Sequence, residues 1–275
     1  MRIIVPIKQV PETNAVKMDE ATGTMIREGV EAIINPLDLY AIEIAIRLRE
    51  AHGGEVVAVS MGPPKAVTAL KEAIAMGCDS AVLLSDKAFA GSDTWATSYV
   101  LAAAIRKLGS YDLIICGERA TDGDTGQVGP GIASFLDLPV VSYVSKVDAV
   151  TLMAAGMSAP ASSAITVHRL VEDGYEVLEM ALPGVLTVVK EVADPRLPTL
   201  RGKQKARKAD IPAWAAKDLP VEAAKLGLSG SPTRVVKIFR PTVARKCEKL
   251  PAADEQAIAA AADRVVQFLQ QKELI

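Results

Sequence analysis

Cysteine and histidine are scarce in this sequence, and their scarcity excludes several kinds of site. The 275 residues include 3 cysteines and 2 histidines. Cys78, Cys116 and Cys247 are odd in number and far apart, which argues against a disulfide framework and against a cysteine zinc cluster. His52 and His168 lack partner groups at the spacing of a general base or a metal site, so we expect both to be structural or solvated. No Gly-x-Ser-x-Gly, His-Glu-x-x-His or P-loop motif is present, so a bound cofactor would have to supply any redox or transfer reactivity.

The charge balance and the apolar pattern exclude two further classes of protein. Lys and Arg number 31 against 33 Asp and Glu, a net charge of −2, whereas a dedicated nucleic-acid binder normally has a basic excess. Apolar runs such as Leu113–Cys116 are far shorter than the ~20 residues that cross a bilayer. The first residues are typical of a strand, not of a signal peptide, because Lys8 follows so early. We expect a soluble cytoplasmic protein of one large domain or two small ones.

Apolar strands alternate with helical periodicity over the first half of the chain. Strands are predicted over 2–7, 55–60, 81–84 and 113–116, and helices over 37–51, 65–76, 92–108 and from the turn after 116 to about 136. Repeated strand, turn and helix is typical of parallel βαβ units, whose strands are apolar throughout because both faces are buried. The sequence therefore predicts an α/β fold with a doubly wound, mostly parallel sheet. Ligands in such sheets bind beyond the carboxyl ends of the strands.

The pattern changes after residue 139. A strand is predicted over 140–144, a hairpin over 165–171 and 175–180, a returning central strand over 184–189 and a helix over 252–274. The Asp173-Gly174 pair is a strong hairpin signal because glycine accepts the positive φ of a tight turn. Residues 194–250 lose periodicity and look like an arm that lies on something else. We therefore divide the chain into an α/β domain over 1–193, a loop over 194–208 and a C-terminal arm over 209–275.

The most informative segment is the glycine-rich stretch 116–130, which follows an apolar strand and leads into a helix. Its glycines would let the backbone approach a ligand, and free amides at a helix start favour an anion such as phosphate. Thr125 and Gln127 add a hydroxyl and an amide. Asp122 and Asp124 have the wrong sign for phosphate and suit helix capping, loop bracing or a ribose hydroxyl. A nucleotide site and a purely structural turn both fit this pattern.

Asn35-Pro36-Leu37-Asp38 reads first as a helix start. Asn35 would be the cap and Pro36 the first helical residue, where a missing N–H costs nothing. A functional interpretation adds Asn35 as an amide contact to a base or a ribose. The spacing favours capping alone.

The basic run 201–208 has a functional and a neutral interpretation. Such a run can bind nucleic acid or an acidic partner, but it is usually a solvated loop. No aromatic residue interleaves it, which argues against single-strand binding. Leu197 and Leu200 lie just upstream, and an exposed leucine beside cations would make a small docking anchor for a partner.

These segments together resemble the β subunit of electron transfer flavoproteins over nearly the whole chain. The stretches that carry the resemblance are Ile7–Thr13, Asn35–Asp38, Val59–Pro63, Leu70–Asp79, Asp122–Pro130, Val167–Arg169, Glu172–Gly174, Glu176–Leu178, Pro183 and Leu186–Thr187. The resemblance implies a heterodimer with an α subunit that moves electrons between acyl-CoA-type flavin dehydrogenases and a membrane quinone oxidoreductase, in either direction. It implies an electron carrier, not an enzyme, with no catalytic side chain in this chain.

The resemblance also implies the cofactors. One FAD is held mainly by the α subunit at the interface, and the β subunit buries an adenine nucleotide, usually AMP. The implied cofactor-binding residues are Pro6, Asn35, Pro36, Leu37, Asp38, Met61, Asp122, Gly123, Asp124, Thr125, Gly126, Gln127, Val128, Gly129, Pro130, Gly131, Ile132 and Ala133. They coincide with the loops that the sheet argument selects independently.

The segment 194–205 resembles the recognition loop of this family, whose leucine docks on the dehydrogenase. Leu200 corresponds to that leucine. The implied partner-binding residues are Leu197, Leu200, Arg201, Lys203 and Lys205. The C-terminal arm and its helix would then wrap the α subunit.

Two other functions stay open. The 122–130 string, with Asp93–Thr97, looks closer to family members that bifurcate electrons, hold a second FAD in place of AMP and oxidise NADH. Gly123 and Gly126 would leave room for the larger ligand, although AMP in a simple carrier is the preferred prediction. A different class is an adenine-nucleotide-binding protein of the universal-stress type, which would need neither the arm nor the basic segment.

Overall fold

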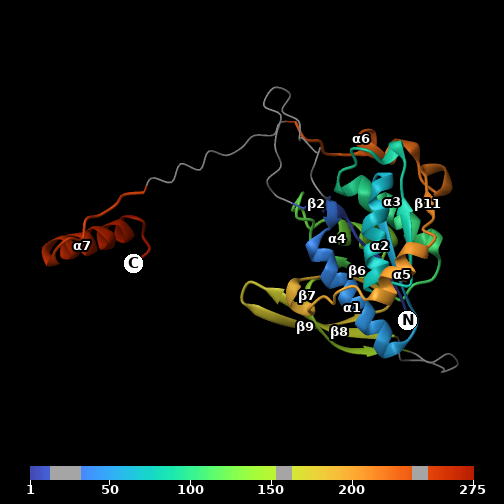
Figure 1. Ribbon diagram of the computed structural model, residues 1–275, viewed down its shortest axis with the longest axis horizontal. Helices are drawn as coiled ribbons and strands as arrows, with labels where there is room; N and C mark the ends of the chain where they lie inside the picture. The colour runs from blue at the N-terminus through green and yellow to red at the C-terminus, as the bar shows by residue number, and fades with distance from the viewer. Residues whose placement is uncertain (13–31, 153–162, 237–246) are drawn as a thin grey trace. The chain divides into compact units, whose positions relative to one another are not determined.

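The computed structural model describes residues 1–12, 32–152, 163–236 and 247–275 (Figure 1). The chain divides into two compact units, residues 1–236 and residues 237–275, and each is described by itself. The first unit contains the sheet and the candidate site. The described part of the second unit contains one long helix.

Among the described residues of the first unit, nine strands form one sheet in the order β11-β5-β4-β1-β6-β10-β7-β8-β9. The strands are β1 (Arg2–Pro6), β4 (Glu55–Met61), β5 (Ser80–Leu84), β6 (Leu113–Gly117), β7 (Val140–Thr151), β8 (Ala164–Val171), β9 (Gly174–Ala181), β10 (Gly184–Val188) and β11 (Ala213–Trp214). All pairs from β11 to β7 are parallel, whereas β8 is antiparallel to β7 and β9. The predicted fold class is confirmed. A short separate pair joins β2 (Gln9–Pro11) to β3 (Ala32–Ile34).

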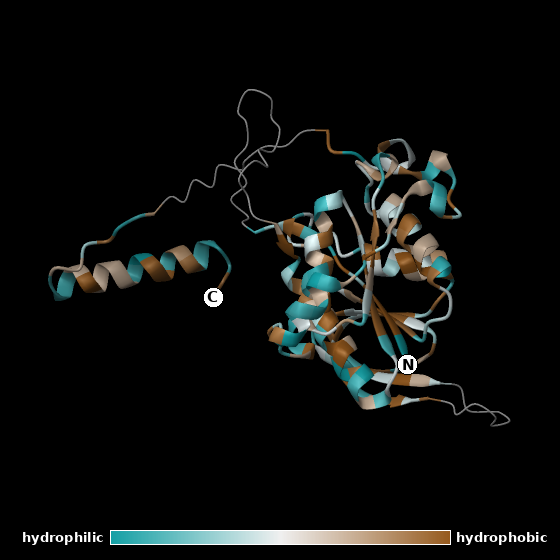
Figure 2. Ribbon diagram, turned by 45° about the vertical axis from the view of Figure 1, so that its right-hand side comes forward, coloured by the Kyte–Doolittle hydropathy of each residue, from teal (hydrophilic) through white to brown (hydrophobic). Residues whose placement is uncertain are grey.

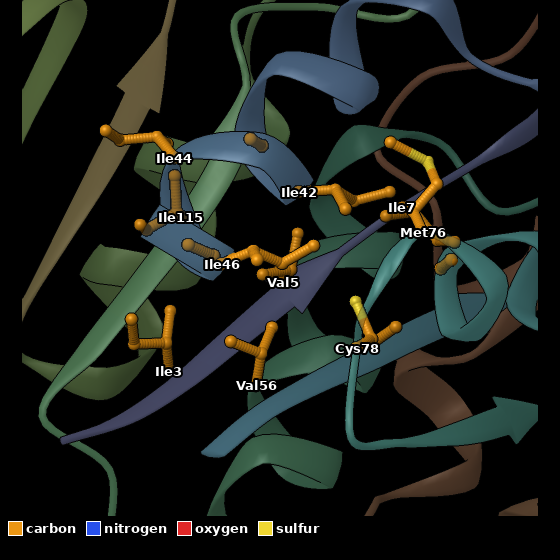
Figure 3. Packing of buried hydrophobic residues seen from close by; sticks show 14 of the residues in the cluster. Ile3, Val5, Ile7, Ile42, Ile44, Ile46, Val56, Met76, Cys78 and Ile115 are labelled. Carbon is orange, nitrogen blue, oxygen red and sulfur yellow. The ribbon is translucent and has the colours of Figure 1, made fainter. Parts of the chain in front are cut away.

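Helices cover both faces of the parallel strands. One core gathers α1 (Pro36–His52), α2 (Val67–Met76) and the buried Ala206 of α5 (Leu200–Lys208). The other gathers α3 (Thr94–Leu108) and α4 (Val128–Leu136). Ile3 and Val5 belong to the first core and Ile4 to the second, so successive side chains of β1 enter opposite cores. Figure 3 shows Val5 in the first core near Ile46 of α1, and Figure 2 shows brown strands enclosed between helices that carry teal residues.

The order of the strands places a topological switch point between β1 and β6. From β1 the chain continues to β4 and β5 on one side, and then returns to β6 on the other side of β1. Both neighbours of β1 are parallel to it, so the carboxyl ends of β1 and β6 lie at the same edge. A crevice opens at such a point because the connections leave in opposite directions.

The second half of the sheet confirms two predictions. β10 lies between β6 and β7 as the expected central strand. β8 and β9 form the expected hairpin, in which Val171 pairs with Gly174 and Gly174 has a φ of +138°. Glycine accepts that φ because it lacks a Cβ.

The structure differs from the predicted irregular arm over residues 194–236. Residues 200–208 form α5, whose first turn is capped by the Thr199 hydroxyl accepting from the Gly202 N–H at 2.9 Å. Residues 213–214 return to the sheet as β11 beside β5. Leu219 and Leu226 enter the second core. They lie next to two short 3-10 helices (Ala216–Asp218 and Ala223–Lys225) and α6 (Gly227–Gly230). This stretch therefore belongs to the first unit and packs on its own sheet.

The predicted C-terminal helix is present as α7 (Glu255–Gln271), capped by Asp254. Four of its apolar side chains, Ile258, Val265, Val266 and Phe268, are exposed within the described part of the chain, and Leu269 is partly exposed. None of the helices in the described ranges is long and apolar enough to cross a membrane.

Candidate functional site

The switch point is braced by the fully buried side chain of Asn35. Its Nδ2 donates to Asp38 Oδ1 and to the backbone oxygen of Arg119, each at 2.9 Å, and its Oδ1 accepts from the Thr121 N–H at 3.1 Å. Both amide hydrogens of Asn35 are thus engaged inside the chain. The side chain therefore ties the start of α1 to the loop after β6, which is 84 residues away in the sequence.

The prediction that Asn35 acts by capping α1 is wrong in its mechanism. Asn35 does occupy the cap position and Pro36 the first turn, but the Asn35 side chain makes no cap hydrogen bond to the helix. An asparagine with both donors committed elsewhere also has little left to offer a base or a ribose. Asn35 shapes the loop on which a ligand would rest.

Asp38 is the second member of this brace. Its buried carboxyl accepts from the Lys8 N–H at 2.7 Å and from Asn35, so it joins the segment after β1 to α1. Burial raises the pKa of Asp38 to about 7, although the two hydrogen bonds and the Lys8 charge act in the opposite direction. Gly117 supplies the necessary space, because a Cβ there would lie 2.4 Å from Asp38 Oδ1.

Two ion pairs neutralise the acidic residues of the loop after β6. Lys8 Nζ lies 2.6 Å from Asp122 Oδ1, across the switch point. Arg119 Nε lies 3.0 Å from Asp124 Oδ1, and Asp124 adopts a φ of +53°. Loop bracing, one of the roles considered for the two aspartates, is what these contacts provide. The pairs also reduce the repulsion that bare carboxylates would exert on a phosphate.

Lys8 is a residue that the predicted site omitted. It is half-exposed and follows the carboxyl end of β1 by two residues. The rule for parallel sheets selects the loop that follows Pro6, and Lys8 lies in that loop, so its position in the sequence was sufficient to find it.

The start of α4 offers backbone donors to an anion. No side chain among the described residues caps this nine-residue helix, and the Gln127 side chain is instead bonded to the Thr94 hydroxyl at 2.8 Å. The N–H groups of an uncapped first turn lack intrahelical partners and favour negative charge. The start of α4 is therefore suited to a phosphate.

The glycines of the loop have different roles. A Cβ on Gly129 would lie 2.5 Å from the Thr187 side chain on β10, and one on Gly131 would lie 2.4 Å from Ser98 Oγ on α3. These two glycines therefore let α4 pack closely on its neighbours. A Cβ on Gly123 would meet nothing within 4 Å among the described residues, so this exposed glycine is not required for packing.

The predicted cofactor-binding residues fall into three groups by burial. The buried ones are Pro6, Asn35, Asp38, Gly129, Ile132 and Ala133. The partly buried ones are Leu37, Met61, Gly126, Val128, Pro130 and Gly131. The exposed ones are Pro36, Asp122, Gly123, Asp124, Thr125 and Gln127. The first group is enclosed by the protein, and the other two are at least partly accessible from solvent.

These features together fit a nucleotide with a phosphate group. The cations Lys8 and Arg119, the first-turn amides of α4 and the Thr125 hydroxyl match an anion, and Gly123 leaves the loop open. Met61 ends β4 beside β1, at the same edge of the sheet. The apolar side of a nucleotide would meet such a residue.

The predicted partner-binding residues lie on a different part of the first unit. Leu197 and Leu200 are 86% and 82% exposed, and Arg201 and Lys203 are exposed as well. Lys205 is partly engaged, since its Nζ donates to the backbone oxygen of Cys78 at 3.0 Å. From Leu200 onward this segment is helix α5, not the expected loop.

Known proteins resemble this chain over most of its length. The family model of the electron transfer flavoprotein domain matches residues 22–219. The chain is 47% identical to the electron transfer flavoprotein subunit beta of Thermoanaerobacterium thermosaccharolyticum, with 94% of this chain and 95% of the relative covered. It is 48% identical to the caffeyl-CoA reductase-Etf complex subunit CarD of Acetobacterium woodii, with 88% of each covered. It is 44% identical to the protein FixA of Azorhizobium caulinodans, with 92% and 89% covered.

Proposed function

Because the chain belongs to the electron transfer flavoprotein family as a β subunit, we propose that it works as half of a heterodimer with an α subunit. The heterodimer relays electrons between flavin dehydrogenases of the acyl-CoA type and a membrane quinone oxidoreductase. It works in the cytoplasm and has no catalytic side chain in this subunit. FAD, held mainly by the α subunit at the interface, accepts electrons singly or in pairs.

The site at the switch point supports an adenine nucleotide in this subunit. The proposal depends on one observation at the carboxyl edge of the sheet. Hydrogen bonds and an ion pair from Asn35, Asp38 and Lys8 hold the loop after β6, which leads into the uncapped start of α4. A rigid loop places the donors before the ligand arrives, so less conformational freedom is lost on binding. AMP is the proposed ligand, bound by the exposed and partly exposed residues of the set.

A second FAD in place of AMP is the second candidate. The exposed Gly123 is compatible with it, because a Cβ there would meet no described atom within 4 Å. In that case the heterodimer would oxidise NADH and divide the electrons between two acceptors. The protein would then be an enzyme in partnership with its α subunit.

One preparation distinguishes these functions. Co-expression with the α subunit is expected to give a yellow 1:1 complex, which is then denatured and its flavins and adenine nucleotides counted. One flavin with one AMP supports the carrier, whereas two flavins with NADH oxidation support the second candidate. A colourless, self-associating chain would contradict both and favour a stress-type nucleotide-binding protein.

Docking on the dehydrogenase is proposed to use Leu197 and Leu200 with the cations Arg201, Lys203 and Lys205 around them. An apolar anchor inside a charged rim suits a complex that must form and separate quickly. Leu200→Ala is expected to slow reduction by the cognate dehydrogenase while the flavin content stays the same. Unchanged transfer kinetics would contradict the role of this anchor.

A further inference from the structure

The segment Pro195–Leu200 presents two leucines to solvent in a fixed geometry. Leu197 and Leu200 are more than four-fifths exposed, although apolar side chains of this size gain free energy when they leave water. Pro195 and Pro198 flank Leu197, and each proline ring fixes its own φ. A flexible segment of this composition could fold its leucines back onto the protein, so something must hold it outward.

Arg196 connects this segment to α1 through two carboxylates. Its Nε donates to Glu43 Oε2 at 2.8 Å, its Nη2 to Glu43 Oε1 at 3.2 Å and its backbone N–H to Glu43 Oε2 at 3.0 Å. Its Nη1 and Nη2 donate to the two oxygens of Glu50 at 2.5 and 3.0 Å. Glu43 and Glu50 are seven residues apart, so they lie on the same face of α1. We call these three residues the Arg196 clamp.

The charges of the clamp are held in their ionised forms. Burial acts to raise the pKa of Glu43, whose side chain is only 2% exposed, but hydrogen bonds from Arg196 and Arg47 outweigh it and the pKa is lowered. Hydrogen bonding from Arg196 lowers the pKa of Glu50. Two-nitrogen contacts between arginine and a carboxylate fix direction as well as distance.

The other end of the segment is anchored to α2. Thr199 caps α5, and a Cβ on Gly202 would lie 2.0 Å from the Ala75 oxygen, so the first turn of α5 rests on the α2 backbone. Figure 1 shows α5 beside α2, with which it makes extensive contacts. The two leucines therefore lie between an ionic anchor on α1 and a packed anchor on α2.

We propose that Arg196 is a positioning residue that holds Leu197 and Leu200 in the conformation that docks on an electron-transfer partner. The inference rests on the proposed function and extends it. Each nitrogen of the Arg196 guanidinium already faces a carboxylate of this chain, so Arg196 is not itself a free cation of the docking rim. The partner surface that fits is an apolar pocket with acidic residues around it, because the exposed charges next to Leu200 are Arg201 and Lys203, for which the described residues supply no ion pair. Holding the segment in advance lowers the entropy lost on docking.

A double-mutant cycle in the co-expressed heterodimer tests this role. The variants are Arg196→Met, Leu200→Ala and the combination, assayed for electron exchange with the cognate dehydrogenase at varied concentration. Arg196→Met is expected to raise the KM for the partner about fivefold and to leave kcat and flavin content unchanged, because docking alone is affected. In the Leu200→Ala background the same change is expected to add less than about twofold.

Arg49→Met is the matched control. Arg49 is also on α1, where it donates to Asp79 Oδ2 at 2.9 Å and to the Gly77 oxygen at 2.8 Å, and its Nη2 lies 3.9 Å from Glu50 Oε1. Arg49→Met therefore removes a cation beside the Glu50 carboxylate but leaves the bonds of Arg196 to Glu43 and Glu50 in place. It should leave the KM for the partner at the wild-type value. Arg196→Lys, which can supply one ion pair in place of the fork, should give an intermediate KM. Equal effects of Arg196→Met and Arg49→Met, or independent effects of Arg196→Met and Leu200→Ala, would overturn the proposal.

Hydrogen exchange separates a failure of the clamp from a failure of the proposed function. Arg196→Met is expected to speed exchange of the backbone amides between residues 194 and 200, other than the two prolines, in the heterodimer, with Arg49→Met unchanged there. A wild-type heterodimer that transfers no electrons would refute the carrier function. The hydrogen-exchange rates would still show whether Arg196 restrains the segment. Unchanged exchange in Arg196→Met overturns the positioning role whatever the transfer assay gives.

Discussion

Gly117 faces the carboxyl group of Asp38. Because Gly117 has no side chain, the Asp38 carboxyl group fits at the switch point. A Cβ on Gly117 would lie 2.4 Å from Asp38 Oδ1 and 2.9 Å from the backbone carbon and oxygen of Leu37. The contact with the backbone cannot be relieved by a side-chain rotation. A residue with a side chain at the end of β6 would therefore clash with the first residues of α1.

Gly117→Ala is predicted to destabilise the protein and to loosen the loop after β6. Forcing a methyl group into this space should cost about 2 kcal/mol and lower Tm by about 5 °C. The matched control is Gly123→Ala, because a Cβ there meets no described atom within 4 Å. Its stability should stay within about 0.5 kcal/mol of the wild type. Thermal unfolding of both variants checks this, and equal Tm values would contradict the packing argument.

Asp38→Asn is predicted to change the pH dependence of stability. Burial raises the pKa of Asp38 to about 7 in the folded protein, above its usual value of 3.8. Between these two pH values the folded state keeps a proton that the unfolded state releases, so this group's contribution to the unfolding free energy falls as pH rises. The contribution is complete below pH 3.8 and is lost as pH passes through about 7. Its slope is at most about 1.4 kcal/mol per pH unit.

Asparagine does not titrate, so the variant should lack this decline. Urea unfolding at pH 5, 6, 7 and 8 measures the effect, and the stability of Asp38→Asn relative to the wild type should improve from pH 5 to about pH 7 and level off by pH 8. The informative quantity is the sign of the change in relative stability with pH. The variant also alters the hydrogen bonds to Lys8 and Asn35, which shifts its stability by an amount that does not depend on pH. Parallel profiles for the two proteins would refute a raised pKa at Asp38.

Lys8→Met is predicted to weaken binding of AMP to the heterodimer by about tenfold, which corresponds to about 1.4 kcal/mol. The change removes a cation from the site and leaves the Asp122 carboxylate without its partner at 2.6 Å. The double variant Lys8→Met/Asp122→Asn removes both charges and should recover part of the affinity. Titration calorimetry with AMP at two salt concentrations checks both steps, because exposed charges are screened by salt. An affinity that is no higher in the double variant would argue against Asp122 acting through charge.

The sequence was sufficient to predict the elements whose signal is local. The apolar strands at 113–116 and 184–189 and the Asp173-Gly174 turn are each encoded by neighbouring residues, and the structure confirms them. The helix over 200–208 was missed because its buried face consists of one alanine, Ala206, among five cations. Apolar periodicity cannot reveal a helix that packs through so small a contact.

The hydrogen bonds of Asn35 and Asp38 at the candidate site join residues that are distant in the sequence, and they could be predicted only in part. The rule for parallel sheets selected the carboxyl edge, and the structure brings the loops at Asn35 and Asp122 together there. The partners of Asn35 are supplied by residues 119 and 121, and nothing near Asn35 in the sequence indicates them. In the same way, Gly129 and Gly131 looked like ligand-binding glycines, although their missing side chains admit Thr187 and Ser98.

Charge placed on the apolar face of α7 is predicted to prevent assembly with the α subunit. Ile258, Val265 and Phe268 recur at a spacing that places them on one face of the helix, and each is about half exposed in the described part of the chain. A face of this kind gains stability when another surface covers it. Val265→Asp with Phe268→Asp is therefore expected to reduce recovery of the 1:1 heterodimer on co-purification by at least about tenfold.

The control is Gln267→Asp, because residue 267 lies on a different face, and it should assemble normally. Equal yields of heterodimer from all three proteins would show that α7 does not contribute to the interface, and the predicted role of the C-terminal arm would then have to be abandoned.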